Sequence, residues 1–170
     1  IETGRARKII LVRDPYSWVL ARARFFVSDE FKGNAEQLKN AGLGIEDLLN
    51  LMIFGIYQKA PPMSELYNFN AVAWLGTNAK LVRYEDLSLH IKALESEAAE
   101  IFFGELLDAC GIKKPCDWRE RVLVGADRKQ SGTARENLSG GNFVFPAQLP
   151  EMQKRLVDYA VPGLRNLLGY

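Results

Sequence analysis

The sequence offers little material for a metal site or for covalent cross-links. Among its 170 residues there are two cysteines and one histidine. These side chains are too few for a plausible zinc site. Cys110 and Cys116 flank the segment 111–115, so they either form a disulfide across a turn or stay free thiols in a reducing cytosol. We interpret His90 as a surface or helix-entry residue and assign it no catalytic role.

The sequence also lacks a long apolar run and a strong net charge. No stretch approaches the roughly 20 apolar residues that are needed to span a bilayer. The formal net charge is +1, so no bulk field attracts nucleic acid or an anionic membrane. We therefore expect a cytoplasmic protein that binds neither nucleic acid nor membranes, in which any recognition of an anion is local.

The residues that are present form an ordinary globular mixture, 48% hydrophobic and 25% charged, and the length fits a single domain over 1–170. A β-branched apolar run predicts a buried strand at 8–12, and a second short strand is predicted at 79–83. The two should be parallel because helical segments separate them. Helices are predicted over 15–31, 45–59, 64–75, 91–110, 118–124 and 149–159, with a loop over 125–145. The expected fold is a helix-rich α/β fold, in which helices flank a parallel sheet. Because two strands make a poor sheet, further strands are expected upstream of Ile1, as in a chain truncated at its N-terminus.

The first candidate site lies where the strand 8–12 runs into Arg13-Asp14-Pro15. Asp14 is a good N-cap and Pro15 suits the first helical position, so a helix N-terminus should follow Arg13 directly. Open α/β sheets bind ligands at the carboxyl ends of their strands, and a helix N-terminus favours an anion. Arg13 could therefore grip a phosphate bidentately, or it could form a salt bridge with Asp14 or another carboxylate.

The second candidate is Tyr84, which follows the strand 79–83 and opens the string Tyr-Glu-Asp-Leu. It should lie on the same edge of the sheet as Arg13, where an aromatic ring could stack on or flank a nucleotide base. Alternatively, Tyr84 is a half-buried tyrosine, and Glu85 and Asp86 cap the next segment.

The third candidate is the basic segment from Asp127 to Arg135, which includes Arg128, Lys129 and Gly132. Cations, small hydroxyl residues and a glycine suit a loop that closes on a phosphate, although a solvated basic loop has the same composition. We expect the segment 127–141 to be a mobile flap that orders on a nucleotide, because its cations repel one another until an anion arrives.

Taken together, these segments resemble the cytosolic and bacterial sulfotransferases. In that family a strand ends in Arg-(Asp/Asn)-Pro before a helix, a later strand ends in Tyr-Glu-Asp-Leu, an Arg-Lys-Gly loop follows, and the chain often closes with a Leu-Gly-Tyr-like end. This sequence contains, in the same order, Arg13-Asp14-Pro15, Tyr84-Glu85-Asp86-Leu87, Arg128-Lys129 and Leu168-Gly169-Tyr170. The resemblance covers essentially the whole chain.

The resemblance implies a P-loop-NTPase-like sulfotransferase fold. The implied reaction moves a sulfuryl group from PAPS (3′-phosphoadenosine 5′-phosphosulfate) to a hydroxyl or amine of a small-molecule or glycan acceptor, with no metal. By position, Arg13 would bind the 3′-phosphate of the donor and Tyr84 would line the adenine pocket. Arg128 and Lys129, in the loop that contains Gly132, would close over the 3′-phosphate.

The sequence departs from the family at several positions. The family's serine on the 3′-phosphate is replaced by Ala21, and Ser17, one helical turn earlier, could substitute for it. Gln130 follows Arg128-Lys129 where the family has glycine, and the tryptophan that the family carries later in the loop is missing, so the loop differs and its register is left open. The family's phosphosulfate-binding loop and catalytic base are expected upstream of Ile1, so no catalytic residue is assigned and the chain by itself is expected to be inactive.

Two other functions stay open. One is a non-catalytic binding or interaction module on a sulfotransferase-like scaffold, and the other is a relative of the P-loop nucleotide kinases, which share the architecture. The apolar stretch 33–76, which contains Leu48, Met52, Phe54 and Tyr57, could form an acceptor wall, although core helices show the same pattern.

Overall fold

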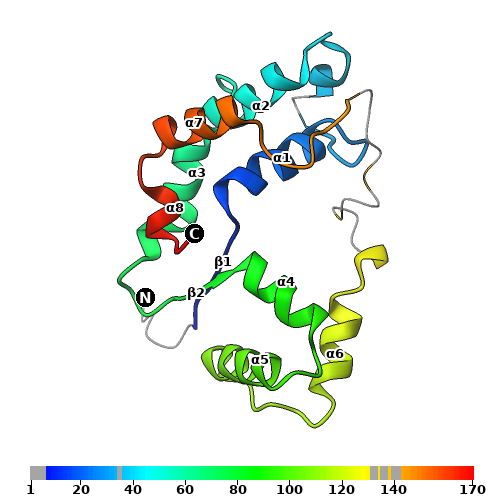
Figure 1. Ribbon diagram of the computed structural model, residues 1–170, viewed down its shortest axis with the longest axis vertical. Helices are drawn as coiled ribbons and strands as arrows, with labels where there is room; N and C mark the ends of the chain where they lie inside the picture. The colour runs from blue at the N-terminus through cyan, green and yellow to red at the C-terminus, as the bar shows by residue number, and fades with distance from the viewer. Residues whose placement is uncertain (1–6, 34–35, 131–133, 135–137, 139–142) are drawn as a thin grey trace. The chain divides into compact units, whose positions relative to one another are not determined.

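The computed structural model describes residues 7–33, 36–130, 134, 138 and 143–170. Over these residues the protein is α/β and helix-rich, with one small parallel sheet (Figure 1). The chain divides into two compact units, the first formed by 1–13 with 70–127 and the second by 14–69 with 128–170. The expected α/β class with parallel strands is confirmed.

The sheet belongs to the first unit. Strands β1 (Ile9–Val12) and β2 (Lys80–Arg83) pair in parallel, with Ile9 opposite Lys80 and Val12 opposite Arg83. Each begins one residue later than the sequence predicts. The prediction succeeds here because both strands are short segments with an apolar centre, and β1 is also rich in β-branched residues, which suit a pleated and partly buried surface.

Helices α4 (Tyr84–Lys92), α5 (Glu97–Cys110) and α6 (Trp118–Gly125) complete the first unit, together with the short η3 (Val72–Trp74). The single helix predicted over 91–110 is wrong, because α4 already begins where β2 ends, and a new helix begins after Ser96. The Ser96 hydroxyl caps α5 by accepting a hydrogen bond from the Ala99 N–H at 3.2 Å. The core that these helices enclose contains Leu94, Ala99, Phe103 and Trp118.

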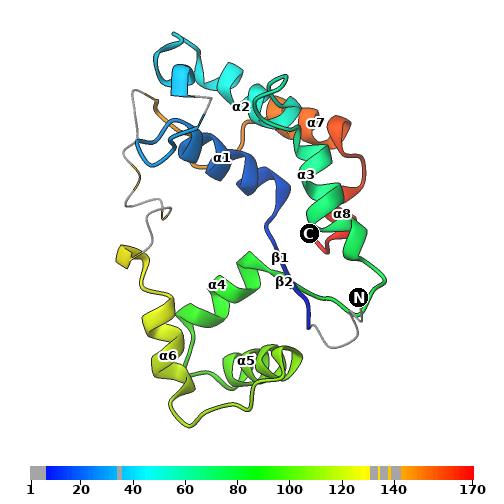
Figure 2. The same cartoon turned by 180° about the vertical axis from the view of Figure 1, so that it is seen from behind.

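The second unit is helical. Its elements are η2 (Glu36–Asn40), η4 (Arg128–Gln130), α1 (Pro15–Phe26), α2 (Ile45–Phe54), α3 (Met63–Asn70), α7 (Glu151–Ala160) and α8 (Leu164–Leu167). Helices α1, α2 and α7 pack against one another (Figure 2). Their core is apolar and includes Leu48, Leu49, Met52, Ile53 and Val157, all inaccessible to solvent. Burial of these side chains stabilises the unit by about 1.5–3 kcal/mol each.

Three helices, α1, α2 and α3, end earlier than predicted, and α3 ends at Asn70 rather than residue 75. Helix α1 ends at Phe26 rather than near residue 31. The Ser28 hydroxyl donates to the Phe25 carbonyl at 2.7 Å, and this bond competes with the backbone hydrogen bond that would continue the helix. Helix α2 ends at Phe54 rather than residue 59, because Gly55 adopts a positive φ of 81°. Helix α8 was not predicted.

Both cysteines are free in the structure, with Cys116 exposed and Cys110 half-buried. His90 lies in the last turn of α4, where its ring stacks on Phe102 at a centroid distance of 4.4 Å. It is therefore a packing residue at a helix end rather than one at a helix entry. Among the described residues, no helix is both long enough and apolar enough to cross a membrane.

Candidate functional site

The structure brings together two residues of the predicted donor site, Arg13 and Tyr84. Both follow the carboxyl end of a strand, and the parallel pairing of β1 with β2 puts those ends at one edge of the sheet. The Arg13 guanidinium carbon lies 4.7 Å from the centroid of the Tyr84 ring, and both side chains are half-buried. This edge therefore combines a permanent cation with an aromatic ring inside a single unit.

The remaining charges at this edge are set by the first turn of α4. Arg83 ends β2, and its Nε donates to Asp86 Oδ2 at 2.7 Å. Asp86 and Glu85 both lie in the first turn of α4, where the positive end of the helix dipole stabilises a carboxylate. Asp86 therefore pairs with Arg83, whereas Arg13 is the cation that lies over the Tyr84 ring.

The other candidate residue near the end of β1 is Ser17, which belongs to the second unit. Asp14 caps α1, since its Oδ1 accepts a hydrogen bond from the Tyr16 N–H at 3.3 Å. The Ser17 hydroxyl lies one turn into the helix and donates to the Asp14 carbonyl at 3.1 Å. To bind a phosphate, the Ser17 hydroxyl would have to turn its hydrogen away from this carbonyl, so its predicted role at the 3′-phosphate stays a prediction.

A cluster around the start of α1 was not found by sequence reasoning. Arg165 of α8 donates from Nε to Asp14 Oδ1 at 2.9 Å, and its guanidinium lies 4.2 Å from the centroid of the Tyr16 ring. The Tyr16 hydroxyl donates to Asp158 Oδ2 at 2.8 Å. Burial and this hydrogen bond raise the pKa of Tyr16 above its ordinary value. The cluster holds the N-terminal turn of α1 against α7 and α8 within the second unit.

The predicted basic loop is described only in part. Arg128 and Lys129 lie in the short turn η4 of the second unit, and both are exposed. Gly132 and most of the expected flap over 127–141 lie outside the described residues. The proposed roles of Arg128, Lys129 and Gly132 in closing over a phosphate therefore stay predictions.

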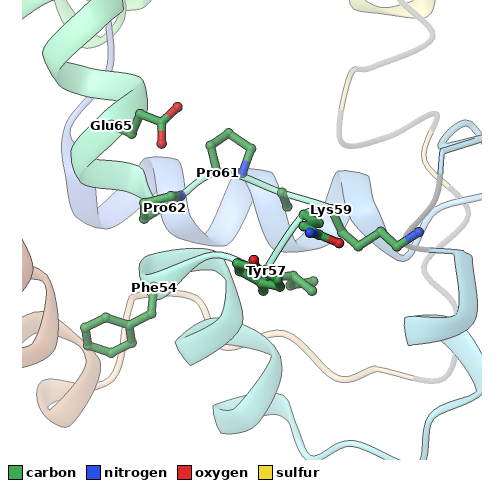
Figure 3. Close-up of a pocket in the computed structure, with 9 residues that line it drawn as sticks. Phe54, Tyr57, Lys59, Pro61, Pro62 and Glu65 are labelled. Carbon is green, nitrogen blue, oxygen red and sulfur yellow. The ribbon is translucent and has the colours of Figure 1, made fainter.

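The stretch predicted as either core or acceptor wall contains buried and exposed residues, and its role as an acceptor wall stays a prediction. Leu48 and Met52 of α2 are fully buried, as core residues are. Phe54 and Tyr57 are 46% and 88% exposed and line an open hollow of 610 Å³ at the end of α2 (Figure 3). Among the described residues, no group of histidine, cysteine and carboxylate side chains is arranged to hold a metal ion.

Comparisons with protein-family models, with curated proteins and with solved structures gave no match. The functional argument therefore rests on the residues of this chain and on their geometry.

Proposed function

We propose that the protein is a PAPS-dependent sulfotransferase with a P-loop-NTPase-like fold, and that Arg13 and Tyr84 form the nucleotide end of its donor site. The observation that carries the proposal is the 4.7 Å approach of the Arg13 guanidinium to the Tyr84 ring at the carboxyl edge of β1 and β2. The strings around both residues resemble those of the sulfotransferases, and ligands of open α/β folds bind at this edge.

The two side chains suit the two halves of an adenosine 3′-phosphate. A guanidinium offers paired N–H donors that match phosphate oxygens, and a phenol ring offers a flat face or edge to a purine. A cation–π contact contributes about 0.5–2 kcal/mol. A hydrogen bond to a charged group contributes about 1.5–3 kcal/mol. A phosphate would therefore compete with the ring for Arg13, and in the proposed site the base lies against Tyr84 while the phosphate binds Arg13.

In the proposed reaction an oxygen or nitrogen of the acceptor attacks sulfur, and the bond from sulfur to the 5′-phosphate oxygen breaks. The products are the sulfated acceptor and adenosine 3′,5′-bisphosphate. The acceptor proton passes to a general base, and we assign that role to none of the described residues. PAPS supplies the activated sulfuryl group. Arg13 acts far from sulfur, by anchoring the 3′-phosphate so that remote binding energy orients the donor.

A non-catalytic nucleotide-binding module is the second candidate. It is favoured by α1, where Ala21 replaces the serine of the family and the Ser17 hydroxyl donates to the Asp14 carbonyl. Such a module would bind adenosine 3′,5′-bisphosphate through Arg13 and transfer no sulfuryl group from labelled PAPS to any acceptor.

Calorimetric titration with adenosine 3′,5′-bisphosphate tests the site itself. Replacing Arg13 by alanine removes a charge-assisted contact of about 1.5–3 kcal/mol, so affinity should fall about tenfold to a hundredfold. Arg121→Ala is the matched control, because Arg121 lies in the same unit, is 69% exposed at its side chain and pairs with Asp117. The affinity of the Arg121→Ala variant for the nucleotide should stay within about twofold of that of the parent. Equal effects of the two substitutions, or no binding by the parent chain, would overturn the proposal.

A further inference from the structure

The hollow at the end of α2 is lined by a tight turn and by the start of α3. Its lining consists of apolar and aromatic side chains with a few polar ones: Phe54, Ile56, Tyr57, Gln58, Lys59, Ala60, Pro61, Pro62 and Glu65. In Figure 3 the Glu65 carboxylate of α3 lies beside Pro61 and Pro62, while Tyr57 and Lys59 come from the turn. The volume of 610 Å³ is in the range of small-ligand sites.

The turn that forms the hollow is held in one conformation. Ile56 and Ala60 form an antiparallel bridge, with N–H to carbonyl distances of 2.8 and 2.9 Å. Gly55 has a φ of 81°, and a Cβ built there would lie 2.7 Å from the Ala60 carbonyl oxygen. Gln58, at the tip, has a positive φ of 56°. Strained backbone of this kind persists where its surroundings enforce it, and it is frequent at ligand sites.

A buried arginine of α1 holds the two ends of the turn through hydrogen bonds to the backbone. Arg22 of α1 donates to the Met52 carbonyl at 3.0 Å and to the Pro61 carbonyl at 2.8 Å, and it is 9% exposed. Burial lowers the pKa of Arg22 to about 10, so it remains a cation at neutral pH. Because Arg22 links the last turn of α2 to Pro61, the walls of the hollow are positioned before any ligand arrives, which reduces the entropy cost of binding.

We propose that this hollow binds a neutral saccharide. A sugar ring has an apolar C–H face and a rim of hydroxyls that donate and accept hydrogen bonds. The hollow offers the matching surfaces, since the Tyr57 ring is 88% exposed and Gln58, Lys59 and Glu65 carry exposed polar ends around it. The inference goes beyond the proposed function and does not depend on it.

The charges of the lining separate this ligand class from two others. Lys59 and Glu65 leave the lining without net charge, so the hollow as a whole does not favour an anion such as a nucleotide. A purely apolar ring would desolvate both charged groups without giving either of them a hydrogen bond. Hydroxyl groups satisfy both, because they donate to the Glu65 carboxylate and accept from the Lys59 ammonium.

The test is an NMR titration of the full chain with three neutral probes, namely cellotetraose, maltotetraose and N-acetylated chitotetraose. At a dissociation constant on the order of 1 mM, at least one probe should shift backbone signals between residues 54 and 65. Tyr57→Ala should weaken that binding about tenfold and Tyr57→Phe should retain it, because the ring supplies the contact. Tyr57 is 88% exposed, so its truncation leaves the core unchanged.

Tyr159→Ala is the matched control, because Tyr159 is 79% exposed, lies in the same unit and does not line the hollow. It should leave the affinity unchanged, as should saturating adenosine 3′,5′-bisphosphate, whose site is proposed elsewhere. The inference is overturned if none of the three probes shifts these signals. It is equally overturned if Tyr57→Ala behaves as Tyr159→Ala, or if 4-nitrophenol binds the same residues more tightly than every saccharide.

Discussion

Replacing Asp14 by alanine should cost about 2 kcal/mol of stability. The Asp14 carboxylate caps α1 through the Tyr16 N–H and also accepts from Arg165 at 2.9 Å, with 20% of its side chain exposed. Loss of an N-cap side chain costs typically about 1 kcal/mol. Loss of a partly exposed ion pair adds about 0.5–1 kcal/mol. Asp14→Asn should cost less than half of this, because the amide oxygen still caps the helix.

Urea unfolding followed by circular dichroism measures the difference, and the slope of the free energy with urea should stay constant. Asp117→Ala is the control, since Asp117 precedes α6 and pairs with Arg121 at 2.9 Å, but its side chain makes no capping hydrogen bond. The Asp117 pair is exposed, so its loss should cost much less stability than the loss of the Asp14 carboxylate. If Asp14→Ala and Asp117→Ala cost the same, the capping cluster does not hold α1 as described.

Two further substitutions probe the second unit. Gly55→Ala should cost about 2–4 kcal/mol of unfolding free energy, because it adds a clash to the strain of a positive φ. Gly163→Ala, with a φ of 72° and nothing within 4 Å of its built Cβ, should cost only about 1 kcal/mol; equal losses would show that the backbone around Gly55 relaxes. In an alkaline titration, Tyr16→Phe should remove one phenol that ionises above its ordinary pKa of 10.0. Because the pKa is raised in the fold, the neutral phenol stabilises the protein fully below the ordinary pKa, and this stabilisation is lost as pH rises through the raised value. If the transition that Tyr16→Phe removes instead lies at or below the ordinary pKa, the described contact with Asp158 is contradicted.

The sequence was sufficient for the strands and for the start of α1, because these are set by local chemistry. A short β-branched run marks β1, a short segment around Leu81 and Val82 marks β2, and Asp14-Pro15 marks a capped helix start. Helix ends were harder to predict, because competing backbone contacts decide them. The apolar pattern of α2 continues through Ile56 and Tyr57, yet the helix stops at Gly55, whose positive φ is stabilised by the turn that follows.

The pairing of Arg13 with Tyr84 could be predicted for a simple geometric reason. Parallel strands end at the same edge, so residues far apart in sequence meet there once the strands are paired. Arg165 could not be found in this way, because it reaches Asp14 from a helix that lies 151 positions later in the chain and that the sequence did not predict. The hollow was also missed, since exposed aromatic residues such as Tyr57 follow the same apolar pattern as buried ones.

The most direct test of the central claim is an intermolecular nuclear Overhauser measurement between adenosine 3′,5′-bisphosphate and the tyrosine rings of the protein. At saturating nucleotide, adenine protons should show contacts with the Tyr84 ring, and these contacts should disappear in Tyr84→Ala. The Arg13 guanidinium signals should shift at the same time, because a phosphate replaces the ring as their partner. Adenine contacts with other tyrosines but not with Tyr84, or an Arg13 signal unmoved by bound nucleotide, would contradict the assignment of this edge of the sheet as the donor site.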